Sequence, residues 1–175
     1  MRLNFPVTNN GYVLNETETI VSKTDLLGNI TYVNGDFIRI SGYSEEELMG
    51  APQNIVRHPE MPRGVFKLFW DTLQQGKEIF AYVKNISMDG SHYWVLANVT
   101  PSVDAGGRVL GYYSVRRKPN PKAIAVVSGL YNDMLQAEQR AGSRDAMTAS
   151  SELLTNFLKS KGQTYEQMVL SLQSL

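Results

Sequence analysis

The sequence predicts a mixed α+β fold in which helices pack on a β-sheet, followed by a helical extension. Short β-type runs occur in two groups, near residues 19–33 and 79–117, and helical segments lie between them. Beyond residue 118 only helical patterns follow. Strands and helices segregated in this way favour a sheet covered by helices. The length of 175 residues favours one main domain with an appendage.

The N-terminal region predicts a polar arm and then two antiparallel strands. Residues 1–17 are mostly polar and contain the turn signal Asn10-Gly11, so they predict an arm that needs another surface to pack on. The runs at residues 19–23 and 30–33 are typical of strands, and the segment between them ends in Gly28-Asn29, which suits a hairpin turn.

Short helices and one longer helix are expected next. Asn34 can cap one helix, and Ser44 with Glu47 forms a capping box for a second. Prolines between residues 51 and 62 exclude a long regular element there. From Val65 to Leu73 apolar residues recur at helical spacing, which predicts an amphipathic helix with an aromatic face.

Three longer strands are expected at residues 79–88, 91–103 and 109–117, joined by turns at Asp89-Gly90 and at residues 104–107. Side chains alternate between the two faces of a strand. If Asn85 faces the interior, the residues on its side include Ile79, Ala81 and Val83, whereas Trp94 has the parity of the opposite face. The residues expected on that outer face are Phe80, Tyr82, Trp94, Leu96 and Tyr113. They would form an apolar surface too large to leave in water, so the arm, the extension or a second subunit should cover it.

Residues 119–175 predict a helical extension. Asn120 caps the first helix, which ends near Gly142; a second ends at Gly162, and Thr164 caps a third. Each helix carries an apolar stripe that must be buried. The helices are expected to fold back on the domain or to swap into a second subunit.

Composition limits the classes of function. The chain has 17 basic and 17 acidic residues, so no net charge favours nucleic acid or an anionic membrane as a partner. No apolar stretch is long enough to span a bilayer, and residues 1–12 lack the apolar core of a signal peptide, which predicts a cytoplasmic protein. The absence of cysteine excludes disulfides, thiolate metal sites and cysteine photochemistry.

Several phrases resemble the PAS domain family over residues 18–118. They are ITYVN at residues 30–34, SGYSEEEL at 41–48 and DGSHYWV at 89–95. Within that family, NIVRHPEMP at 54–62 and VKN at 83–85 resemble the FAD-binding sensor domain of bacterial aerotaxis receptors. The resemblance implies a five-stranded antiparallel sheet with helices on one face, divided as an arm at 1–17, a sensor domain at 18–118 and the extension at 119–175.

The resemblance also implies a pocket between the inner sheet face and residues 54–73. Flavin-binding photoreceptor relatives carry flavin-facing polar residues at the positions of Val95 and Arg116, and their photoreactive cysteine would fall near Ile55. The residues expected to bind the cofactor are Asn34, Arg57, His58, Phe66, Trp70, Asn85, Tyr93 and Arg116. The aerotaxis family typically has a pocket tryptophan where this chain has Ile79, which puts the identity of the ligand in question.

Each of these residues also has an ordinary structural interpretation. Arg57 can grip a pyrophosphate or pair with Glu60, and Asn85 can bind a flavin edge or satisfy backbone groups. Phe66 and Trp70 can stack on a ring or simply pack in the core. For Asn34, capping the following helix is sufficient.

Three functions remain open. The first is a redox or oxygen sensor for aerotaxis or another chemotaxis response, which binds FAD noncovalently and signals to a partner protein or homodimer through the outer sheet face and the extension. The second is a haem sensor with His58 or His92 as axial ligand. The third is a cofactor-free module that binds a small metabolite or dimerises. No nucleophile and base combination suggests an enzyme.

Overall fold

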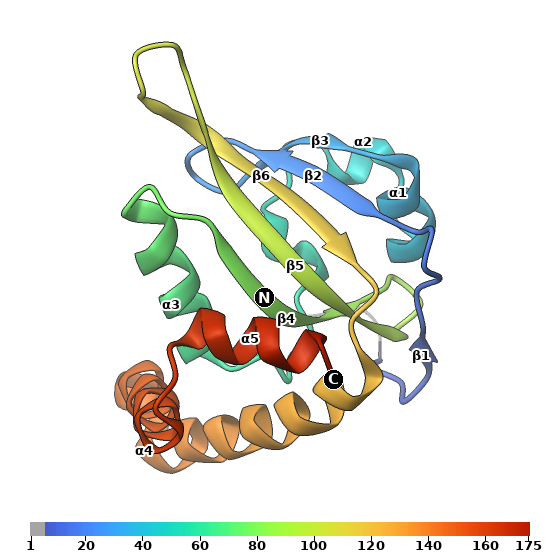
Figure 1. Cartoon of the computed structure of the whole chain (residues 1–175). Helices are drawn as coiled ribbons and strands as arrows, with labels where there is room; N and C mark the ends of the chain where they lie inside the picture. Colours follow the sequence, from blue (N-terminus) through green and yellow to red (C-terminus); the bar gives the residue numbers. More distant parts are fainter. Residues whose placement is uncertain (1–5) are drawn as a thin grey trace.

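The computed structural model describes residues 6–175, and residues 1–5 of the predicted arm lie outside the described part. Five antiparallel strands form the sheet in the order β3-β2-β6-β5-β4, and the short strand β1 adds a sixth (Figure 1). The mixed α+β prediction is therefore confirmed. The strands are β1 Gly11–Tyr12, β2 Ile20–Thr24, β3 Ile30–Val33, β4 Ile79–Ile86, β5 His92–Val103 and β6 Val109–Arg117.

Strand β1 is an addition that the sequence did not indicate. It pairs in parallel with β5, Gly11 opposite His92 and Tyr12 opposite Tyr93. Strand β6 pairs with β5 only from Leu96 onward, so the first residues of β5 have a free backbone edge. The arm completes that edge, with the His92 amide donating to the Asn10 carbonyl at 2.9 Å. A two-residue strand has no sequence pattern of its own and depends on the edge it meets.

Four helical elements cover the inner face of the sheet. Asn34 caps the first of them, since its side chain accepts from the Phe37 amide at 3.2 Å, and it also accepts from the Val21 amide at 2.9 Å. The predicted capping box of Ser44 and Glu47 is present. These elements are α1 Gly35–Ser41, α2 Glu45–Leu48, the 3₁₀ turn η1 Gln53–Val56 and α3 Arg63–Gln74.

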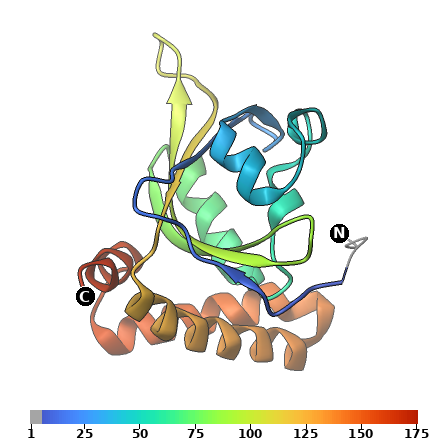
Figure 2. The same ribbon diagram turned by 90° about the vertical axis from the view of Figure 1, so that its right-hand side faces the viewer.

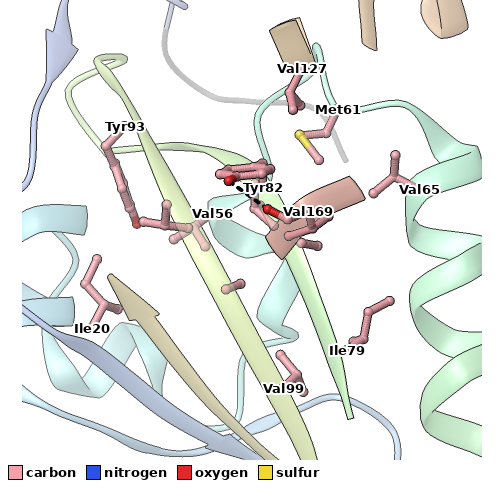
Figure 3. Close-up of a cluster of buried hydrophobic side chains, with 14 of the residues drawn as sticks. Ile20, Val56, Met61, Val65, Ile79, Tyr82, Tyr93, Val99, Val127 and Val169 are labelled. Atoms are coloured by element: carbon pink, nitrogen blue, oxygen red, sulfur yellow. Dashed lines mark hydrogen bonds between the residues drawn. The ribbon is translucent and has the colours of Figure 1, made fainter. Parts of the chain in front are cut away.

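The C-terminal helices pack on the outer face of the same chain's sheet (Figure 2). They are α4 Pro121–Lys161 and α5 Tyr165–Gln173. Gly142 has a φ of 74° inside α4 and divides it into two helical segments, as its position in the sequence predicts. The Tyr82 hydroxyl donates to the Val169 carbonyl at 3.1 Å, which ties α5 to β4 (Figure 3). Of the two arrangements left open, folding back on the domain is the one observed.

The predicted alternation of the strands is confirmed. Ile79, Ala81 and Val83 are buried on the inner face with Asn85. On the outer face the tail, which consists of α4 and α5, covers Tyr82. The Trp94 ring lies 6.1 Å from the ring of Tyr131 in α4. The cover is incomplete, because Tyr113 on β6 remains 37% exposed. Within residues 6–175, no helix combines the length and apolar character needed to cross a membrane.

Candidate ligand-binding site

A cavity lies between the inner sheet face and helix α3. It has about 790 Å³ of atom-free space when its mouth is included, of which about 130 Å³ can hold the centres of water molecules. The larger figure includes open solvent, and the smaller one lies below the roughly 300–1,000 Å³ that a typical small-molecule site encloses. The cavity is lined by Thr24, Gly28, Gln53, Asn54, Val56, Arg57, Phe66, Phe69, Trp70, Leu73, Val83, Asn85, Ala97, Val99, Tyr112, Ser114 and Arg116.

Helix α3 forms an aromatic wall of this cavity. Phe66, Phe69, Trp70 and Leu73 recur at spacings of three and four, so they share one face of the helix. The Trp70 ring meets the Tyr112 ring of β6 edge to face at 5.4 Å. Such a wall offers flat apolar surface to a planar ring system.

Arg57 and Asn85 meet at the edge of β4. The two residues form an antiparallel bridge, and both line the cavity. The Arg57 guanidinium lies 4.2 Å from the Phe66 ring centroid and donates to the Met61 carbonyl at 2.8 Å. Burial lowers the pKa of Arg57, and the nearby carboxylate of Glu138 opposes that shift. The predicted ion pair between Arg57 and Glu60 is not formed, because Glu60 pairs with Lys84.

His58 does not line the cavity, although its neighbour Arg57 does. Arg57 forms a single antiparallel bridge with Asn85 of β4, and the extended backbone at such a bridge points successive side chains to opposite sides. His58 therefore turns toward the outer side, where its ring lies 5.9 Å from that of His92. Burial, assisted by the charge of Lys84, lowers the pKa of His58 to about 4.

A polar group of buried side chains lies on the wall opposite α3. Arg116 is 5% exposed and donates to the Ser22 hydroxyl at 3.0 Å, and that hydroxyl donates to Gln53 Oε1 at 2.9 Å. Among the cavity-lining residues, three buried side-chain atoms have no hydrogen-bond partner within residues 6–175: Arg116 Nη1, Gln53 Nε2 and Ser114 Oγ. Native proteins seldom leave buried polar atoms unpaired, so these atoms mark a place prepared for a ligand or for water.

The structure divides the sequence-predicted residues into two sets. Five of them line the cavity: Arg57, Phe66, Trp70, Asn85 and Arg116. The other three do not. Asn34 caps α1, His58 faces the outer side, and Tyr93 is fully buried in the core with a hydroxyl that lacks a partner in the described chain. Ile79 is buried on the inner face but is also not a lining residue.

Sequence reasoning missed Gln53 and Ser114. Ser114 could have been found, because it lies two residues before Arg116 and therefore shares its face of β6. Gln53 lies in the proline-rich segment, where no periodic pattern predicts the direction of a side chain.

Helix α4 binds the N-terminal end of helix α3, which carries the aromatic wall. Helix α3 begins after Pro62 without a side-chain cap of its own. Glu138 of α4 accepts from the Arg63 amide at 2.5 Å, and the Ser150 hydroxyl accepts from the Gly64 amide at 3.0 Å. A Cβ atom at Gly64 would lie 2.8 Å from the Ser151 nitrogen, so only glycine allows this approach. A carboxylate at a helix N-terminus is stabilised by the helix dipole.

The geometry does not favour a haem site. Neither His58 nor His92 lines the cavity, so neither is placed there as an axial ligand. Within the described part of the chain, no three histidine, cysteine or carboxylate side chains gather as a candidate metal site.

Comparisons with known proteins point to one family. A family model described as the PAS fold matches residues 13–117. The chain is 42% identical over 125 residues to the aerotaxis receptor of Escherichia coli, covering 71% of this chain and 24% of the receptor. It is 29% identical over 105 residues to the nitrogen fixation regulatory protein of Klebsiella pneumoniae, covering 60% of this chain and 21% of that protein. The chain thus spans about a quarter or less of the length of these relatives.

Solved structures support the same fold. The light state of the blue-light photoreceptor Aureochrome1 LOV matches with a TM-score of 0.56 at 24% identity, over 67% of this chain and 92% of that one. A light-oxygen-voltage domain studied with a flavin analogue matches with a TM-score of 0.54 at 24% identity, over 66% and 87%. At these identities the likeness establishes the fold alone.

Proposed function

Because the chain belongs to the PAS family, we propose that it is a sensory domain that binds FAD noncovalently in the cavity and relays the redox state of FAD to a partner protein. The similarity to the E. coli aerotaxis receptor and the flavin analogue of a structural neighbour support this choice of ligand class. A cytoplasmic location and the domain boundaries at residues 17 and 118 remain predictions.

The observation that carries the proposal is the contrast between the two cavity walls. One wall is aromatic, with Phe66 and Trp70 on α3, and the other carries buried polar atoms that lack partners in the described chain. A flavin ring has flat faces to stack and a polar edge to receive hydrogen bonds, so it fits both walls. When bound, FAD would supply a ring whose charge and hydrogen bonding change with its redox state.

Individual residues can be given roles in this proposal. Asn85 offers both a donor and an acceptor on the cavity side of β4, and its carboxamide would hold a polar ring edge. Arg57, stacked on Phe66 at the rim, would hold a phosphate group of the cofactor. A cysteinyl adduct is excluded because the chain has no cysteine, and no residue is assigned a catalytic role.

The contact between α3 and the tail provides a route for the relay. Helix α3 lines the cavity with one face, while its first amides bond to Glu138 and Ser150 of α4. A shift of α3 caused by the ligand would therefore change the seating of α4. The outer surface of the tail would then present that change to a partner or to a second copy.

The test is the flavin content of the purified protein. The wild-type protein should be yellow, with the visible absorption bands of a flavin, and the released cofactor should be identified as FAD by chromatography. Arg57→Ala and Asn85→Ala should each lower the flavin-to-protein ratio. The matched controls Arg108→Ala and Asn98→Ala alter residues outside the cavity lining and should leave the ratio unchanged.

A cofactor-free module that binds a small metabolite is the second candidate. The observation in its favour is the modest enclosed space of about 130 Å³. A colourless protein that takes up no FAD when the cofactor is added would support this candidate. If Arg57→Ala and Asn85→Ala both retain a full flavin content, the cavity is not the flavin site.

A further inference from the structure

We infer that the wall formed by Arg116, Gln53 and Ser114 binds an acceptor-rich ring edge and holds it more tightly when that edge carries negative charge. This inference rests on the proposed function. For a flavin, two electrons from an added reductant and one proton from water convert the neutral oxidised ring into a reduced ring with one negative charge, and the protein favours that anionic reduced ring over the neutral oxidised one.

The hydrogen bonds that join Arg116, Ser22 and Gln53 run in one direction. A guanidinium can only donate, so the Ser22 hydroxyl must accept from Arg116. The Ser22 proton is then directed to Gln53, which must accept it with Oε1. The carboxamide of Gln53 is thereby oriented, and its NH₂ group is the end left without a partner among residues 6–175.

The unpaired polar groups at the cavity can all act as hydrogen-bond donors. Arg116 Nη1 and Gln53 Nε2 are both donors, and both are buried at the cavity without a partner in the described residues. The Ser114 hydroxyl also lines the cavity and can rotate to donate as well. A ligand edge that brought further donors would leave all of them unsatisfied, whereas carbonyl oxygens or an anionic nitrogen would satisfy them.

Arg116 also brings a buried positive charge to the cavity wall. Arg116 is almost completely buried, and none of the ion pairs found in residues 6–175 includes it. Its guanidinium donates a hydrogen bond to the Ser22 hydroxyl, and the guanidinium carbon lies 5.1 Å from the centroid of the Phe37 ring. Burial lowers the pKa of Arg116 to about 10, so the side chain is still charged at neutral pH. A buried cation without a counterion is costly, and an anion in the cavity would remove that cost.

The consequence is a shift in redox preference. A site that binds the reduced form of a ligand more tightly than the oxidised form raises the midpoint potential of that ligand in proportion to the logarithm of the ratio of the two affinities. The size of the shift reports how strongly Arg116 favours the charged form.

The experiment is a redox titration of the flavin-loaded protein, with dithionite as reductant and a mediator dye, in wild type and three variants. Arg116→Gln removes the charge, and Arg116→Lys keeps it. Arg117→Gln makes the same change at the adjacent exposed position of β6 and serves as the control. Visible spectra follow the oxidised flavin, and circular dichroism checks that each variant is folded.

We expect Arg116→Gln to lower the preference for the reduced form at least tenfold, which corresponds to about 30 mV for the two-electron couple. Arg116→Lys should retain most of the wild-type potential, and Arg117→Gln should match wild type. Equal potentials in wild type and Arg116→Gln would overturn the inference while leaving the proposed flavin binding intact. An equal shift in Arg116→Gln and Arg116→Lys would assign the effect to packing and also overturn it. A wild-type protein that binds no flavin would overturn the proposed function and this inference together.

Discussion

The two faces of the sheet are built from alternate residues of the same strands, yet they are completed in different ways. On the outer face, the Tyr131 hydroxyl donates to the Tyr82 carbonyl at 2.8 Å, and the Tyr82 hydroxyl in turn reaches α5. On the inner face, Arg116 and Gln53 keep buried donors without partners in the described chain, beside an open cavity. The chain itself completes one face, and the other is suited to an added ligand.

This difference separates stability from recognition. Filling space and pairing polar groups stabilises a fold, whereas a cavity and an unpaired buried donor each cost free energy. The outer face therefore should contribute to stability, and the inner face gives up some stability to keep a binding site. A change on the inner face should therefore affect mainly ligand binding, and a change of equal chemistry on the outer face should affect mainly the free energy of unfolding.

The largest contrast is expected from adding the same bulk to each face. Ala97→Leu places a larger side chain into the cavity, so it should abolish flavin binding while changing the free energy of unfolding by less than about 1 kcal/mol. Ala123→Leu adds the same atoms to a fully buried position of α4 and should cost about 1–3 kcal/mol without loss of flavin. Denaturant titration and flavin content measure the two effects.

Equal destabilisation by both substitutions would contradict the comparison. It would mean that the cavity is no more tolerant of added volume than the packed interface beneath the tail.

The next effect is a pH dependence of stability that arises from His58, whose side chain faces away from the cavity that its neighbour Arg57 lines. The pKa of His58 falls from its ordinary value of 6.5 to about 4 on folding, so the unfolded chain binds more protons between these values. The free energy of unfolding should therefore fall as the pH is lowered from 6.5 to 4, on the order of 3 kcal/mol at about 1.4 kcal/mol per pH unit. Thermal unfolding across this range should show the decline.

In His58→Asn, the Asn oxygen can accept the Glu60 amide in place of Nδ1. This variant should lose most of the decline, while its stability at pH 7.5 remains near that of wild type. An unchanged pH dependence would show that His58 is already protonated in the folded protein.

A smaller effect is expected at the joint between the cavity wall and the tail. Glu138→Ala removes the carboxylate that caps α3 and should lower the free energy of unfolding by about 1–2 kcal/mol. Glu152→Ala, an exposed position of the same helix, is the control and should be nearly neutral. If α3 carries the relay, hydrogen exchange in α4 should depend on flavin in wild type and lose that dependence in Glu138→Ala.

The smallest effect is the loss of one hydroxyl from the outer face. Tyr82→Phe removes the hydrogen bonds to Val169 and Gln173 and should cost about 1 kcal/mol. Tyr113→Phe, on the part of the outer face that the tail leaves exposed, should cost nothing measurable. Equal costs in a denaturant titration would show that the tail contact adds no stability beyond the sheet itself.

The parts of the fold predicted correctly are those with short-range signals. The caps at Asn34 and Ser44, the break at Gly142 and the alternation along β4 each depend on residues a few positions apart. The candidate site was predicted in two ways. The shared face of Phe66 and Trp70 follows from helical spacing, whereas Arg57, Asn85 and Arg116 were expected from the resemblance to flavin-binding PAS domains.

The features that sequence reasoning missed depend on distant partners. His58 is expected beside Arg57 in the site because nothing in the sequence shows that Arg57 bridges to Asn85 of β4, which turns the two neighbouring side chains to opposite sides. Glu138 has no capping signature of its own, since the helix it caps begins 75 residues earlier. Likewise, β1 exists because β5 extends beyond β6 and leaves a free edge.

The sequence by itself determined which elements form and which side of each strand is apolar, because backbone preferences and side-chain periodicity act locally. Only the tertiary structure decided which face would be filled by the tail and which would remain hollow. It also decided that Arg116 would meet Ser22, 94 residues away, and leave Nη1 without a partner among residues 6–175. The physical reason is that a cavity and an unpaired donor are properties of the space between elements, and that space is set by how all of them pack at once.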